Sequence, residues 1–102
     1  MESLGYTAAK QRPGRHLLDV ELRLHQRVVA RDRSALLEWL QLVGDVVYCA
    51  ALSRTGRDAE AEELTEALFL EVWRHPAMFH PADGPLGLQL IRRMSQRPVA
   101  VA

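Results

Sequence analysis

The sequence predicts an all-α domain, a compact bundle of about four helices. Apolar residues recur every three or four positions in four segments, which is the period of a helix buried on one side. No segment shows the alternation of apolar and polar residues that is typical of a half-buried strand. The chain has 102 residues, of which 48% are hydrophobic and 25% charged, and this suits a single folded domain.

The first helix is predicted to follow an N-terminal arm. Residues 1–15 lack a helical period and contain two glycines and a proline, so we expect a flexible segment there. The helical domain is expected to span residues 16–97, and residues 98–102 to form a loose C-terminal end. The stripe that predicts the first helix consists of Leu17, Val20, Leu24 and Val28.

The second helix is predicted between a polar cap and a glycine. Asp32 or Ser34 can accept a hydrogen bond from the first turn, and Gly56 suits the residue after the last turn. The apolar stripe between them predicts the buried face. It consists of Leu36, Trp39, Leu40, Val43, Val47, Ala50 and Ala51.

The third and fourth helices are separated by a loop rich in proline. We expect Asp58 to cap the third helix and Pro76 to end it near His75, because a proline disfavours helical geometry in the residue before it. Pro85 suits the first turn of the fourth helix, and Pro98 ends it. The predicted inner positions are Ala61, Leu64, Leu68, Phe69, Val72 and Trp73, then Leu86, Leu90 and Met94.

The charges cancel in sum but are sorted along the chain. Thirteen basic residues balance thirteen acidic ones, which excludes a polycation that grips phosphate along its whole length. Residues 1–57 carry a net charge of +3, residues 58–71 carry −6, and residues 72–102 carry +3. The acidic segment favours a separate charged face, or else it complements the dipole of the third helix.

Motifs for catalysis or cofactor binding are absent from the sequence, so we expect neither an enzyme nor a cofactor. Glu71, His75 and His80 have the residue types of a metal site, but they lack a fourth ligand and lie across a proline loop. We therefore interpret the two histidines as surface loop residues and expect no metal. Cys49 lies among Val47, Ala50 and Ala51, so we expect a buried thiol and not a nucleophile.

The sequence favours a cytoplasmic protein. A single cysteine cannot form an internal disulfide, which suits a reducing compartment. No apolar run approaches the roughly 20 residues that span a bilayer, and the N-terminus lacks the pattern of a secretory signal. We expect no contact with a membrane.

The third predicted helix resembles a segment of bacterial RNA polymerase sigma factors. Residues 61–73 read AEELTEALFLEVW, and region 2 of the extracytoplasmic-function (ECF) group often reads Glu-Asp-Leu-Thr-Gln-Glu-Val-Phe-Leu-x-Val-Trp there. Residues 79–86, FHPADGPL, are similar to the Phe-x-Pro-x-x-Gly-x-Leu motif that follows in the family. The resemblance runs from about Asp32 to Leu90.

The resemblance implies a contact with core RNA polymerase. In the family this helix docks on a coiled coil of the polymerase largest subunit, where basic side chains meet it. The carboxylates would supply charge complementarity, and the apolar residues anchoring or core support. The implied polymerase-binding residues are Glu62, Glu63, Leu64, Glu66 and Phe69. Glu66 and Ala67 depart from the family's Gln and Glu.

The resemblance also implies a role in recognising and melting the promoter −10 element. The family's next helix carries a Trp-Leu pair followed by basic and aromatic residues, whereas this chain has Gln89 before Leu90 and no aromatic residue after Phe79. Arginines remain for DNA phosphates, although they also suit a solvated helix end. They are Arg92, Arg93 and Arg97.

Two interpretations therefore stay open. The first is the region 2 domain of a sigma factor, either short by nature or part of a longer chain. The second is a sigma-like interaction module that binds polymerase or a sigma regulator, such as an anti-sigma factor, without reading DNA.

Overall fold

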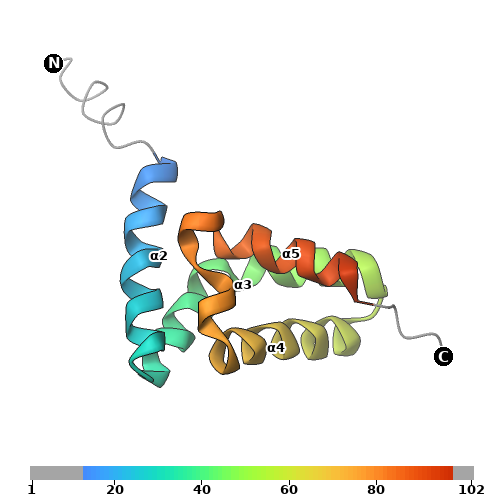
Figure 1. The fold of residues 1–102 in the computed structure, drawn as a ribbon. Coiled ribbons are helices and arrows are strands. Elements are labelled where there is room, and N and C mark those ends of the chain that lie inside the picture. The colour runs from blue at the N-terminus through green and yellow to red at the C-terminus, as the bar shows by residue number, and fades with distance from the viewer. Residues whose placement is uncertain (1–12, 98–102) are drawn as a thin grey trace, which may run out of the picture.

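The computed structural model describes residues 13–97, and these residues form helices and turns without a strand. Figure 1 shows α2 standing across one end of the bundle, while α3, α4 and α5 lie along one another. The predicted all-α bundle of four helices is confirmed. The elements are α2 (Pro13–Val29), α3 (Arg33–Thr55), α4 (Asp58–Arg74), the 3-10 turns η1 (Pro76–Phe79) and η2 (Pro81–Asp83), and α5 (Leu86–Gln96).

Helix α2 begins earlier than the apolar stripe predicts. It starts at Pro13, so residues 13–15 belong to the helix and not to an arm. Proline is common at the first helical position because its missing N–H has no partner there. Residues 1–12 and 98–102 lie outside the described residues, and so do the rest of the expected arm and the expected C-terminal end.

The predicted stripes form the core. Helix α3 packs against α2, α4 and α5, and its Trp39 and Val47 are fully buried. Asp32 caps α3 by accepting a hydrogen bond from the backbone N–H of Ser34, and Gly56 ends the helix in the left-handed conformation with φ 75°. Both predicted ends of this helix are confirmed. The buried apolar residues of the other helices include Leu24, Val28, Ala61, Leu68, Phe69, Val72, Leu86, Leu90 and Met94.

A buried carboxylate joins three helices. Glu21 of α2 is 1% exposed, and it accepts hydrogen bonds from the indole Nε1 of Trp39 (2.8 Å) and the backbone N–H of Leu86 (3.2 Å). Leu86 is the first residue of α5, so the carboxylate also faces the positive end of that helix dipole. The sequence analysis missed Glu21, although it lies between the stripe positions Val20 and Leu24.

The predicted cap of α4 is wrong. Asp58 is the first residue of the helix, and the capping position is held by Arg57, whose side chain makes no capping bond. The Asp58 carboxylate instead accepts a hydrogen bond of 2.5 Å from the hydroxyl of Tyr48 on α3. This hydrogen bond, together with burial and nearby negative charge, raises the pKa of Tyr48 to about 12.

The prediction of a buried Cys49 is also wrong, because the thiol is exposed. The buried face of α3 runs through residues four apart, and Val47 belongs to it. Each residue turns a helix by about 100°, so a position two residues after Val47 lies on nearly the opposite side. Apolar neighbours in the sequence therefore did not indicate burial.

The sequence contains no unbroken apolar run of about 20 residues, but α3 is long and apolar enough on average to cross a membrane, a criterion that the core helix of a bundle also meets. Among the described residues it is one helix of that length and composition, with a mean hydropathy of 1.5 over 18 residues, of which 22% are buried. Glu38 and Asp45 interrupt the apolar run of α3, but two acidic residues leave its mean hydropathy high. In the bundle, Glu38 pairs with Arg27 of α2 at 2.9 Å.

Candidate functional site

The three carboxylates expected to meet a partner all lie on the surface of α4. Glu62, Glu63 and Glu66 are exposed. Residues four apart share a face of a helix, so Glu62 and Glu66 point the same way, whereas Glu63 is turned by about 100° from Glu62. The acidic surface is therefore split between two directions.

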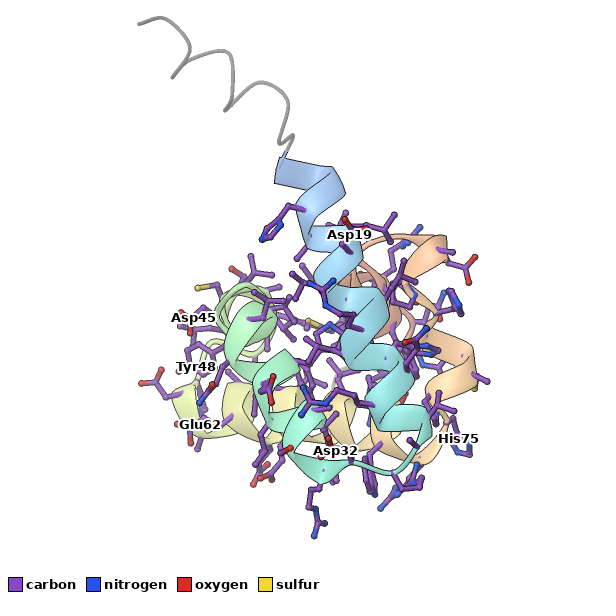
Figure 2. All side chains as sticks on the ribbon, turned by 90° about the vertical axis from the view of Figure 1, so that its left-hand side faces the viewer. Asp19, Asp32, Asp45, Tyr48, Glu62 and His75 are labelled. Atoms are coloured by element: carbon purple, nitrogen blue, oxygen red, sulfur yellow. The ribbon has the colours of Figure 1, made fainter. Side chains whose placement is uncertain are left out.

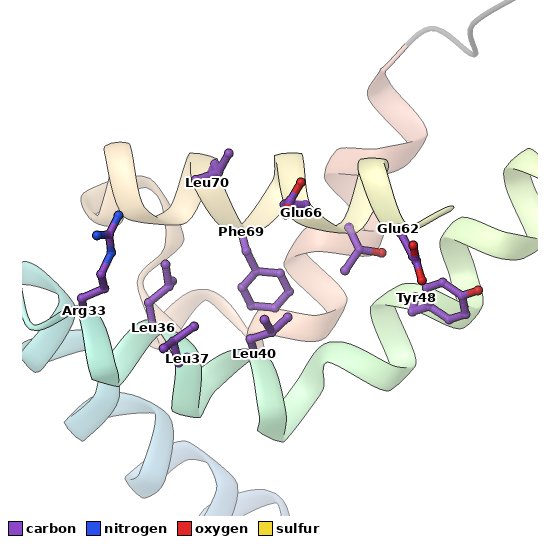
Figure 3. Close-up of a pocket in the computed structure, with 10 residues that line it drawn as sticks. Arg33, Leu36, Leu37, Leu40, Tyr48, Glu62, Glu66, Phe69 and Leu70 are labelled. Atoms are coloured by element: carbon purple, nitrogen blue, oxygen red, sulfur yellow. The ribbon is translucent and has the colours of Figure 1, made fainter. Parts of the chain in front are cut away.

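A groove of about 410 Å³ runs between α3 and α4 beside this acidic surface. Its walls are mostly apolar, and two of its leucines are largely open to solvent, with Leu37 55% and Leu70 40% exposed. Figure 3 shows Phe69 pointing from α4 toward Leu40 of α3. The residues that line the groove are Arg33, Leu36, Leu37, Leu40, Tyr48, Glu62, Thr65, Glu66, Phe69 and Leu70.

The groove has opposite charges at its two ends. Figure 3 shows Arg33 at one end, beside Leu36, and Glu62 at the other end, beside Tyr48. Glu66 lies between them on α4. A ligand that covers the leucines would meet a cation at one end and two carboxylates toward the other.

The structure brings together three of the five residues that the resemblance assigns to polymerase binding. Glu62, Glu66 and Phe69 line the groove, and Phe69 is only 4% exposed. Glu63 is exposed but does not line the groove, and Leu64 is half-buried against the core. The α3 side of the groove was not predicted from the sequence. Leu37 could have indicated it, because this leucine lies next to the stripe residue Leu36 but outside the predicted buried face.

The arginines of α5 do not form one exposed group. Glu71 of α4 accepts a hydrogen bond from Nε of Arg93 at 2.9 Å and a second bond from Nη1 of Arg97. Burial disfavours the charged form of Glu71 and acts to raise its pKa. The hydrogen bonds and positive charges of Arg93 and Arg97 together have the larger effect, so the pKa of Glu71 is lowered. The backbone carbonyl of Arg97 also accepts a hydrogen bond of 2.7 Å from Arg54, so this residue is held twice.

Arg92, unlike Arg93 and Arg97, does not pair with Glu71. It is exposed and lines a polar pocket of about 350 Å³ along α5, between this helix and the loop before it. The other residues of this pocket are Met78, Phe79, Asp83, Gln89, Arg93 and Gln96. Carboxylate, amide and guanidinium groups therefore surround one hollow.

Gln89 has a structural role that its sequence position did not reveal. Its side-chain amide donates hydrogen bonds to the backbone carbonyls of His80 (2.9 Å) and Gly84 (2.8 Å). These bonds tie α5 to the loop before it. A tryptophan, with its one N–H, could donate only one of the two.

The histidines do not gather into a metal site. The Glu71 carboxylate is engaged by arginines, and Nδ1 of His80 accepts a hydrogen bond of 3.0 Å from the N–H of Ala82. Within residues 13–97, no group of three or more His, Cys, Asp or Glu side chains is placed to hold a metal ion. His75 is exposed at the end of α4 (Figure 2), and His80 is exposed as well.

His25 was not singled out from the sequence. It is buried on α2, and its Nε2 lies 2.9 Å from the carbonyl of Pro76, to which it donates. Its ring packs edge-on to Trp39 and tilted against His80. These contacts fix η1 and η2 against α2 and so position the loop that leads to α5.

Comparison with known proteins gives no relative: no protein-family model, no curated protein and no solved structure matches this chain.

Proposed function

We propose that this chain is the region 2 domain of an ECF-type sigma factor, which binds core RNA polymerase and takes part in recognising and melting the promoter −10 element. The observation that carries the proposal is the groove between α3 and α4, where exposed leucines lie beside Glu62 and Glu66. The sequence resemblance over residues 32–90 supplies the partner, a coiled coil of the polymerase largest subunit. This work would take place in the cytoplasm, where the polymerase is.

The groove fits one helix of such a coiled coil. Apolar side chains of the coil would cover Leu37 and Leu70, and basic side chains would meet Glu62 and Glu66. Opposite potentials raise the rate of encounter and fix the register of the two surfaces. Arg33 at the far end of the groove adds a preference for an acidic side chain there, which would set the direction of the bound helix.

Charge reversal at the groove tests this contact. The double variant Glu62→Lys with Glu66→Lys should weaken binding to purified core polymerase, and the loss should be greater at low salt because screening is then weaker. Glu60→Lys is the matched control, since Glu60 is exposed on α4 but does not line the groove. Equal binding by the double variant and the control would contradict the proposed contact.

A specific observation favours the second candidate function, a sigma-like module that binds polymerase without reading DNA. Arg93 and Arg97 both pair with the single carboxylate of Glu71, which leaves Arg92 as the exposed arginine of the three. A gel-shift assay with core polymerase and forked promoter DNA separates the two functions. Sequence-dependent opening supports the sigma function, a supershift without opening supports the module, and a lack of polymerase binding contradicts both.

A further inference from the structure

The end of the molecule where α2 turns into α3 carries exposed arginines around one tryptophan. Trp73 lies in the last turn of α4, and the guanidinium of Arg31 is 3.7 Å from the centre of its ring, with that of Arg33 at 5.9 Å. Arg74 and His75 come next in the chain, and both are exposed. Figure 2 shows His75 and the turn residue Asp32 at the same end of the molecule. Arg31, Arg33, Arg74 and His75 are termed the basic end.

The positive charge of the basic end is not cancelled by its neighbours. Within residues 13–97, no carboxylate forms an ion pair with Arg31, Arg33 or Arg74. The carboxylates at this turn, Asp32 and Glu38, both pair with Arg27 at 2.9 Å. The surface therefore differs from α5, where one carboxylate serves two arginines.

Arg31 holds an unusual backbone position. It follows α2 with φ 68°, in the left-handed region that glycine adopts without cost, and a side chain there costs roughly 1–2 kcal/mol. The Arg31 guanidinium donates a hydrogen bond of 2.7 Å to the carbonyl of Trp73 and lies over the indole ring. These two contacts favour arginine over glycine at this turn, and they hold the guanidinium in a fixed plane.

We propose that the basic end binds the phosphate backbone of a nucleic acid. A guanidinium has five N–H donors in a planar fork that matches phosphate oxygens. Arg31 uses one of its donors for the hydrogen bond to the Trp73 carbonyl, and the others remain for a phosphate. A guanidinium stacked on an aromatic ring also offers a flat surface for a nucleotide base, which an acidic peptide would not use. The proposal does not depend on polymerase binding: Arg33 also lines one end of the groove, but Arg31, Arg74 and His75 do not, and none of the four lines the pocket around Arg92.

Salt-dependent binding to DNA of random sequence tests the proposal without polymerase. The double variant Arg33→Gln with Arg74→Gln removes two charges that make no hydrogen bond or ion pair within residues 13–97, and it leaves the structural Arg31 in place. Binding of a labelled duplex of about 30 base pairs is measured by fluorescence anisotropy at roughly 50 to 300 mM NaCl, a range over which counterion release changes the affinity strongly. The logarithm of the DNA-binding constant falls linearly with the logarithm of the salt concentration. The steepness of this line should decrease by about 2 in the variant, because two phosphate contacts are lost and each contributes about 0.9.

Arg57→Gln is the matched control, because Arg57 is an exposed arginine at the other end of α4. The control should keep the slope and affinity of the unmodified chain. An unchanged slope in the double variant, an equal loss in the control, or no binding of DNA by the unmodified chain would each overturn the proposal. Equal binding to a poly-glutamate peptide would also overturn it, since the surface would then recognise any polyanion.

Discussion

The carboxylate of Glu21 and the indole of Trp39 form a hydrogen bond of 2.8 Å in the interior of the bundle, where both side chains are fully buried. The same carboxylate accepts the backbone N–H of Leu86. This pair fixes α2 against α3 and sets where α5 begins. It therefore positions both the groove on α3 and the arginines of α5.

Replacing Glu21 should destabilise the whole bundle. Glu21→Ala leaves the indole N–H and the Leu86 N–H buried without a partner, so we expect a loss of about 2–4 kcal/mol in the free energy of unfolding. Urea denaturation followed by circular dichroism measures this loss. Asp19→Asn, an exposed change on the same helix, should stay within about 0.5 kcal/mol. A loss below about 0.5 kcal/mol for Glu21→Ala would show that the buried carboxylate does not join the helices.

Arg31 should tolerate glycine better than alanine. Arg31→Ala and Arg31→Gly both lose the hydrogen bond to the Trp73 carbonyl and the stacking on the ring. Only glycine relieves the φ of 68°, so Arg31→Gly should be more stable than Arg31→Ala by about 1 kcal/mol. Thermal unfolding of the two variants compares them directly. Equal stability would mean that this turn is not held in the left-handed region.

Glu71 should make the stability of the fold depend on acid. Its pKa is lowered in the folded state, so its contribution is present above its unfolded pKa and is lost as the pH falls through the folded value. Glu71→Gln should therefore be less stable than the unmodified chain at pH 7, and the difference should shrink below about pH 4.5. Urea midpoints from pH 7 to pH 3 measure it. A difference that stays constant with pH would contradict the ion pairs with Arg93 and Arg97.

Tyr48 should ionise only at very high pH. Its pKa of about 12 comes first from the hydrogen bond to Asp58, so Asp58→Asn should bring it back toward 10. Because the folded pKa is raised, the stability that this bond adds is present below pH 10 and is lost as the pH rises through 12. Ultraviolet difference titration at the phenolate absorption band, at about 295 nm, follows the ionisation. Identical titration of the two proteins would exclude the Tyr48–Asp58 hydrogen bond in solution.

Sequence patterns predicted the features that depend on residues close together in the chain, namely the positions of the helices and the caps of α3. The apolar stripes placed the four helices, and Asp32 and Gly56 marked both ends of α3 because caps act within one turn. Two of the errors concern contacts between helices. Asp58, the first residue of α4, binds Tyr48 of α3 and does not cap its own helix, and Glu71 binds arginines 22 and 26 residues away.

The candidate site was predictable in part for the same reason. Exposure of Glu62, Glu63 and Glu66 followed from their place on the polar side of α4. The groove did not, because it needs Leu37 and Leu70 from two helices to face the same solvent-filled space. Whether these two leucines lie side by side depends on how the helices pack, and the spacing of apolar residues within one helix does not predict that.

One pair of variants tests the proposed role of the groove between α3 and α4 as the polymerase-binding surface. Leu37→Asp places a charge in the groove, whereas Leu88→Asp places the same charge on α5, and the two leucines are equally exposed, at 55% and 56%. Affinity for core RNA polymerase is measured by surface plasmon resonance after circular dichroism has checked the fold of both. We expect Leu37→Asp to lose affinity about tenfold or more, on the order of 1.4 kcal/mol, and Leu88→Asp to lose none. Equal affinity of the two variants, or a loss confined to Leu88→Asp, would contradict this role of the groove.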